Sequence, residues 1–371
     1  MNDECPSCNE YREKGYPFCG VCGRSLEQTE QDPETDAYQN PPPQEFTPQP
    51  EPPRFGFLEL ILLAACVFVL FVAVFEAITL AVHFSDITVL LSDKTLGFIV
   101  IVPFPYSIFS LGGLALQAYW VFVAATIVLC VVITIQKFIF GFRTPAGNSD
   151  PGAAENTAAF WICVSVTAMY LINFIIVLIT EASGSEIGVP DFGSKLEQMF
   201  LVADASLWEE IIARMLYIGV PVAVISLLVA KPNARLVDSL KCLLGGFGMS
   251  KTAVILIILS GMVFGLAHYP GWENQLWKVF ATTLMGMFLG YIFVRFGLYA
   301  SILLHFINNY LTSFDWMGVG ALLFIVVIIF MIVGAIALIY LMKKSLKLPS
   351  TIMSLPSFKN GYIKDEEQSQ L

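Results

Sequence analysis

The chain has 371 residues, of which 56% are hydrophobic and only 13% are charged, and its mean hydropathy is +0.72. This composition excludes an ordinary soluble domain and predicts a polytopic membrane protein. The formal net charge is −10, but much of the acid lies in one linker and in the C-terminal tail. The net charge is therefore uninformative about the substrate, and no nucleic-acid partner is expected.

Four cysteines near the N-terminus form two C-x-x-C knuckles separated by ten residues. This spacing lets two tight turns present four thiolates to one tetrahedral Zn²⁺ ion, so we predict a structural zinc ribbon over residues 1–26. Metal binding would supply its folding energy, and its partner is unknown. The alternative is two disulfides, which seldom occur in C-P-x-C and C-G-x-C knuckles. The predicted zinc ligands are Cys5, Cys8, Cys19 and Cys22.

Residues 27–54 are rich in Pro, Gln and Glu and cannot bury enough apolar surface to fold. They are predicted to form an extended, disordered linker. We expect a transmembrane domain over residues 55–346 and a C-terminal tail over residues 347–371.

Eight apolar segments have about the 20 residues that are needed to cross the hydrocarbon core, although the seventh is short. A further stretch, 97–111, is apolar but interrupted by proline, so it is expected to be re-entrant or interfacial. The sequence thus predicts an all-α polytopic membrane protein with about eight transmembrane helices. The segments are 57–82, 113–136, 158–180, 206–230, 251–269, 276–295, 298–313 and 318–342.

The Lys and Arg residues of the loops predict the orientation, because cytoplasmic loops carry an excess of them. With a cytoplasmic N-terminus, only Lys94, Lys195 and Lys278 lie outside. We therefore expect a multi-pass protein of the cell membrane with both termini in the cytoplasm, a reducing compartment that favours zinc over disulfides. The cations placed inside are Arg54, Lys137, Arg143, Lys231, Arg235, Lys241, Arg295, Lys343, Lys344 and Lys347.

The stretch LWEEIIARMLYIG brings three charges into an otherwise apolar span. Ionisable groups at this depth cost about 2.5–3.5 kcal/mol each, so they are usually paired or functional. Glu210 and Arg214 are four residues apart, the spacing of a helical ion pair. Glu209 lies about 100° round the helix and is left as a spare carboxylate, unless it merely faces interfacial water.

Two of the three histidines lie in other spans. His268 follows Phe264 by one turn, and His305 shares a helix face with Asn309. A lone histidine in a bundle is usually a hydrogen-bonded core residue. A glutamate, two histidines and an asparagine on three apolar segments must each be desolvated, however, and one shared cavity satisfies them all.

This set of side chains suits hydrolysis of an amide bond. A carboxylate beside a histidine can hold a water molecule and remove its proton. A second histidine and an asparagine amide can donate hydrogen bonds to the oxyanion of the tetrahedral intermediate. The alternatives are a non-catalytic transporter or ligand-binding protein, and a scaffold recruited through its zinc ribbon. Transport would lead us to expect an internal repeat, and none is found.

Three motifs, EEIIAR, FGLAH and HFINN, occur in this order on three spans. They resemble the signature of the CAAX protease and bacteriocin-processing family of intramembrane endopeptidases, most specifically over residues 205–310. This family includes the type II CAAX prenyl proteases, which remove the last three residues of prenylated proteins. The resemblance implies a membrane-bound or lipidated substrate in the lipid bilayer. The zinc ribbon and the linker are not part of the family pattern and leave the physiological substrate open.

Carried over residue by residue, the resemblance implies that Glu209 and His268 activate water. It also implies that His305 and Asn309 stabilise the oxyanion. The resemblance leaves the need for a catalytic metal open, and the oligomeric state is not specified. The supporting residues are Glu210, Arg214 and Phe264.

Overall fold

The computed structural model describes residues 57–101, 105–141, 155–188, 190, 192–229, 236–272 and 275–345. They belong to one compact unit, Pro52–Leu371. The predicted zinc ribbon with its four cysteines, the predicted linker and the C-terminal tail lie outside the described residues.

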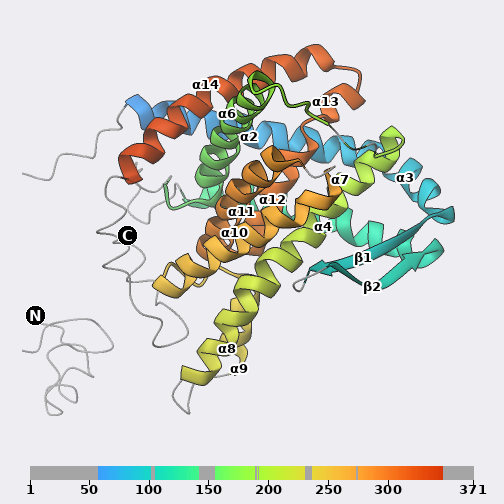
Figure 1. The fold of residues 1–371 in the computed structure, drawn as a ribbon, viewed down its shortest axis with the longest axis horizontal. Coiled ribbons are helices and arrows are strands. Elements are labelled where there is room, and N and C mark those ends of the chain that lie inside the picture. Colours follow the sequence, from blue (N-terminus) through green and yellow to red (C-terminus); the bar gives the residue numbers. More distant parts are fainter. Residues whose placement is uncertain are drawn as a thin grey trace, which may run out of the picture. The chain divides into compact units, whose positions relative to one another are not determined.

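Seven helical segments of the described chain are long and apolar enough to cross a membrane. This finding confirms the predicted class, a helical polytopic membrane protein (Figure 1). The fourth segment is one continuous rod made of α7 (Lys195–Glu210), a π-helix η2 (Ile211–Gly219) and α8 (Val220–Val229). The other six are α2 (Phe57–Val82), α4 (Gly113–Gly141), α6 (Ala158–Ala182), α10 (Lys251–Gly271), α11 (Leu276–Phe296) and α14 (Gly320–Ser345).

The predicted span at 298–313 is a shorter helix, α12 (Leu298–Tyr310), of 13 residues. At 1.5 Å per residue it is about 20 Å long, less than the roughly 30 Å of a hydrocarbon core. All its residues from Ala300 to Ile307 are buried. It is an interior helix, enclosed by α4, α6, α7 and α11. This position explains why its sequence is mostly apolar on all sides. The remaining short helices are α3 (Phe84–Leu90), η1 (Leu91–Asp93), α9 (Leu236–Lys241), η3 (Cys242–Leu244) and α13 (Ser313–Trp316).

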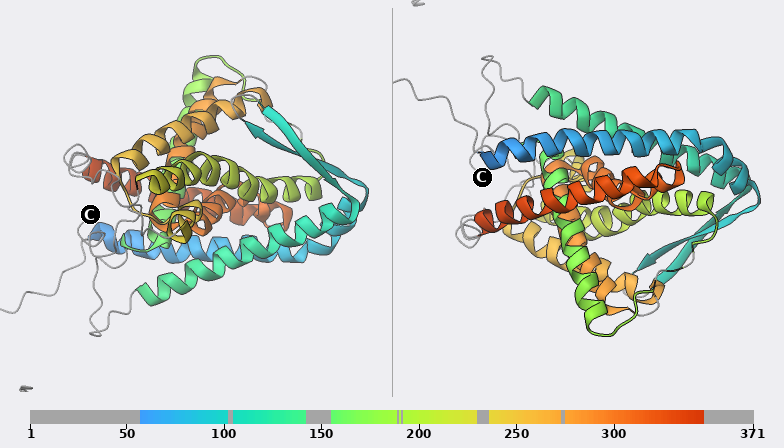
Figure 2. Two further views of the ribbon diagram at one scale, coloured as in Figure 1. Left: turned by 90° about the horizontal axis from the view of Figure 1, so that it is seen from below. Right: turned by 90° about the horizontal axis from the view of Figure 1, so that it is seen from above.

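The proline-interrupted stretch forms an antiparallel hairpin of β1 (Thr95–Ile101) and β2 (Pro105–Gly112), an exception to the all-α prediction. Its register runs from Thr95 opposite Gly112 to Ile101 opposite Pro105, with an irregularity after Phe98. The Phe98 ring is buried against the rings of Tyr119 and Trp208. In both views of Figure 2 the hairpin lies beside the helices rather than between them.

The acidic motif lies where helix α7 continues into the π-helix η2. Ser194 caps α7, and its side chain and that of Glu197 form a capping box. Directly after Glu210 the helix becomes the π-helix η2. Such wide turns are rare in proteins as a whole, but where they occur they are often at functional sites. The change from α-helix to π-helix therefore singles out the segment that follows Glu210.

Helices α10 and α11 approach each other through glycines. A Cβ atom on Gly286 would lie 2.9 Å from the Cα atom of Gly261, and one on Gly290 would lie 3.2 Å from Ile257. A side chain on Gly286 would therefore force the two backbones apart. This contact confirms that the G-x-x-x-G spacings serve packing within the bundle, and it holds α10 in place beside the site.

Candidate active site

Three helices bring together three of the four predicted catalytic side chains. Glu209 lies in the last turn of α7, His268 in the last turn of α10 and His305 in the middle of α12. The Oε2 atom of Glu209 lies 3.9 Å from Nε2 of His268 and 3.7 Å from Nε2 of His305. One third of the Glu209 side chain is exposed, whereas His305 is almost fully buried. Glu209 is therefore accessible, but it faces two histidines and not only solvent.

The other nitrogen of each histidine ring is already engaged. Nδ1 of His268 lies 2.8 Å from the carbonyl oxygen of Phe264, which can only accept a hydrogen bond. Nδ1 of His305 lies 3.0 Å from Oε1 of Glu210, a carboxylate that also pairs with Arg214. Both Nδ1 atoms therefore carry a proton, and in the neutral rings both Nε2 atoms present lone pairs toward Glu209.

The pairing of Glu210 with Arg214 is confirmed. Their Oε2 and Nε atoms are 3.2 Å apart, and both side chains are fully buried. Nη1 of Arg214 also donates to the hydroxyl of Ser260, which in turn donates to the carbonyl of Ala213. A buried charge needs such partners because the membrane interior does not solvate it.

Phe264 lies between the charged pair and the histidines. Its ring packs edge-on against His268, with centroids 4.8 Å apart, and against His305 at 5.9 Å. The guanidinium carbon of Arg214 lies 4.8 Å from the same ring centroid. The Phe264 ring thus contacts both imidazole rings and the guanidinium of Arg214, which agrees with the supporting role that the resemblance implies.

Asn309 lies one helical turn beyond His305 on α12. Its Oδ1 atom accepts a hydrogen bond from Nδ2 of Asn308 at 3.2 Å, which leaves its own Nδ2 as the group that can donate elsewhere. Asn308 is held in turn by Tyr170, whose hydroxyl donates to the Asn308 carbonyl at 3.1 Å. Among the described side chains, Asn309 makes no hydrogen bond to Glu209, His268 or His305.

Sequence reasoning missed two charged neighbours of the site. Lys278 interacts electrostatically with Glu209 and His268, and its Nζ lies 3.6 Å from the ring centroid of Trp272. Asp204 interacts with Glu209 and accepts a 2.6 Å hydrogen bond from Tyr119. Both residues lie in or beside a predicted span, and an ionisable residue at such a place is a signal that could have identified them.

No group of three or more His, Cys, Asp and Glu side chains in the described part of the chain is arranged to hold a metal ion. The predicted structural zinc site lies outside the described residues.

The fold and the site define a polytopic membrane protein in which a carboxylate and two histidines from three helices lie close together. Residues 196–311 match the family model described as type II CAAX prenyl endopeptidase Rce1-like. The match extends from α7 through α12 and includes every predicted catalytic and supporting residue. This match supports the assignment of residues 196–311 to the family of CAAX-type proteases. No curated protein and no solved structure gives a significant match.

Proposed function

We propose that the protein is an intramembrane endopeptidase that cuts a peptide bond near the C-terminus of a membrane-bound protein. C-terminally prenylated proteins of the CAAX type are the candidate substrates. One observation carries the proposal: the Glu209 carboxylate faces the Nε2 atoms of both His268 and His305 at 3.7–3.9 Å. The family match supports the same activity in general terms.

These distances suit a water molecule better than direct contacts. They are too long for hydrogen bonds between the side chains, and a water molecule can bridge the Glu209 carboxylate and a histidine Nε2. A water molecule there donates one proton toward Glu209 and the other toward a histidine Nε2. Its lone pair is then available for attack on a carbonyl carbon.

The reaction follows from these contacts. The water oxygen attacks the scissile carbonyl carbon while one water proton passes to Oε2 of Glu209, and the carbonyl oxygen becomes an oxyanion. His268 accepts a hydrogen bond from the remaining hydroxyl group. When the intermediate collapses, the carbon–nitrogen bond breaks and Glu209 gives its proton to the leaving amide nitrogen. The products are an amine and a carboxylic acid, which then loses its proton to water or to the amine.

Oxyanion stabilisation is the proposed role of Asn309 and His305. The Asn309 amide can donate through Nδ2, because its oxygen is held by Asn308. His305 can donate through Nε2 only as an imidazolium. Glu210 orients the ring, because its carboxylate accepts a hydrogen bond from Nδ1 at 3.0 Å.

Two further proposals concern the N-terminal and C-terminal segments, which lie outside the described residues. Cys5, Cys8, Cys19 and Cys22 hold one structural zinc ion, which metal analysis of the purified protein tests. Both termini face the cytoplasm, and labelling of tags at each end of the chain in intact and permeabilised cells tests the orientation.

The test of the function is turnover of a farnesylated C-a-a-X peptide by the purified, reconstituted full chain. We expect release of the C-terminal tripeptide, measured by mass spectrometry with and without a chelator. The matched control is Glu209→Gln, and the non-prenylated peptide tests recognition of the lipid. Tripeptide release that is equally fast in both proteins would contradict the proposed function.

A further inference from the structure

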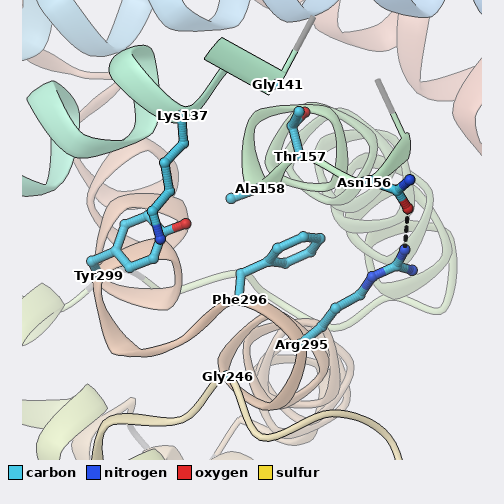
Figure 3. A pocket seen from close by; sticks show the side chains of 9 residues that line it. All are labelled: Lys137, Gly141, Asn156, Thr157, Ala158, Gly246, Arg295, Phe296 and Tyr299. Carbon is cyan, nitrogen blue, oxygen red and sulfur yellow. Dashed lines mark hydrogen bonds between the residues drawn. The ribbon is translucent and has the colours of Figure 1, made fainter. Parts of the chain in front are cut away.

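A cavity of about 370 Å³ lies between the ends of several spans, and it is separate from the residues of the proposed reaction. It is lined by the end of α4, the start of α6, the end of α11 and the start of α12 (Figure 3). Its volume is in the range of small-ligand sites. Lys137 and Tyr299 lie on one side of it, Arg295 and Asn156 lie on the other, and the ring of Phe296 lies between them.

Arg295 is fixed in the wall of this cavity. Its Nη1 donates to the hydroxyl of Tyr291 at 2.6 Å, and its Nη2 donates to the carbonyl of Glu155 at 3.3 Å. The guanidinium carbon also lies 5.2 Å from the ring centroid of Trp161. All these partners are neutral groups, so they orient the guanidinium without neutralising its charge.

The second cation is Lys137, whose Nζ lies 4.4 Å from the ring centroid of Tyr299. The lining of the cavity contains no carboxylate. The nearby carboxylate of Glu155 pairs with Lys344. Within the described chain, neither Lys137 nor Arg295 forms an ion pair, so the described lining of the cavity is positively charged.

The cavity adjoins the ends of predicted spans, which is where a membrane–water interface is expected. It adjoins the last turns of the spans α4 and α11, and the ends of α4 and α14 lie at the same end of the bundle (Figure 2). Tyr and Trp gather at lipid headgroup level, and here Trp161 packs against Tyr291 at 5.0 Å and close to Tyr340 at 6.2 Å. The basic loops predict that this is the cytoplasmic side, whose leaflet carries anionic lipids.

We propose that this cavity binds the phosphate group of an anionic phospholipid. The guanidinium of Arg295 and the ammonium of Lys137 would contact the phosphate oxygens, and Phe296 would cover the apolar part of the lipid next to the headgroup. The charges of Lys137 and Arg295, which pair with no carboxylate of the described residues, select an anion. The apolar ring between them favours an amphiphile over free phosphate.

The test is ligand-induced stabilisation of the full chain in a neutral detergent. The probes are phosphatidylglycerol, phosphatidylcholine and inorganic phosphate. We expect phosphatidylglycerol to raise the melting temperature in a saturable way, because a ligand that binds the folded state stabilises it. Phosphatidylcholine should not do so. Lys137→Gln and Arg295→Gln should each weaken the apparent affinity about fivefold, and the double variant about 25-fold.

Matched variants separate this site from general surface charge. Lys343→Gln removes a cation of the last turn of α14 that does not line the cavity, and its affinity should equal that of the wild type. Lys137 is exposed, so its variant should fold even if Arg295→Gln does not. Equal affinity in Lys137→Gln and the wild type, or equal losses in Lys343→Gln and Lys137→Gln, would overturn the proposal. A saturable shift with inorganic phosphate that Lys137→Gln removes would retain a phosphate site but overturn the lipid as its source.

Discussion

Nδ1 of His305 donates a hydrogen bond to Oε1 of Glu210 at 3.0 Å, across the contact between α12 and α7. The same carboxylate pairs with Arg214 through its other oxygen. Glu210 therefore joins a buried ion pair to a histidine of the candidate site. The effect of the ion pair on stability and the effect of the hydrogen bond to His305 on turnover can be tested separately.

Replacing Arg214 by Leu should reduce stability strongly, because it leaves the buried Glu210 carboxylate without its cation. Breaking such a pair costs about 3–5 kcal/mol. The double variant Arg214→Leu, Glu210→Leu should regain part of this stability but not turnover, because His305 then lacks its acceptor. Thermal melts and peptide turnover measure the two effects. A double variant that melts no higher than Arg214→Leu would count against the pairing.

Asn309→Asp should lower kcat by about 10²–10³, because it keeps the shape of the side chain and removes the proposed oxyanion donor. Asn308→Ala should cost about tenfold or less, since Asn308 orients the amide of Asn309 through one hydrogen bond. Steady-state kinetics at saturating peptide give both values. Wild-type kcat in Asn309→Asp would remove Asn309 from the mechanism.

Glu76 of α2 is fully buried, and neither of its carboxylate oxygens has a hydrogen-bond partner among the described residues. An unpaired polar group costs about 1–3 kcal/mol in folded proteins. Glu76→Met, which is close in volume, should therefore raise the melting temperature and leave turnover unchanged. Glu76→Ala is the control, because it also leaves a cavity and should lose that gain. A folded Glu76→Met protein without activity would show that this carboxylate serves the chemistry.

The residues 1–53 should be dispensable for turnover of a short peptide. A linker of the predicted composition transmits no defined geometry to the first span. We expect a chain that begins at Arg54 to retain wild-type turnover of the farnesylated peptide. The measurement compares the two proteins at equal folded concentration. A folded truncated protein without turnover would show that the N-terminal segment takes part in the reaction.

The spans and the charged motifs were predictable because they are local patterns. Apolar length located six of the long helices within a few residues of their ends, and four-residue spacing located the pair of Glu210 with Arg214. The fourth span begins earlier than expected, at Lys195, because a capping box at Ser194 starts α7 in a more polar segment.

What the sequence did not predict depends on contacts between elements. The hydrogen bond between Glu210 and His305 joins residues 95 positions apart, and no spacing rule within a helix reports it. The hairpin was missed because its pattern is apolar rather than alternating. It forms where Phe98 packs against Tyr119 and Trp208, which are distant in sequence. The π-helix after Glu210 likewise has no sequence signal that we could read.

The central claim is that Glu209 is the general base, and turnover of Glu209→Gln tests it most directly. Glutamine keeps the shape of the side chain but cannot take a proton from water. We predict that kcat on the farnesylated peptide falls by about 10²–10⁴ with little change in substrate binding. Glu210→Gln, which can still accept the hydrogen bond of His305, should lose less activity and more stability. Equal kcat in the wild type and in folded Glu209→Gln would contradict the account.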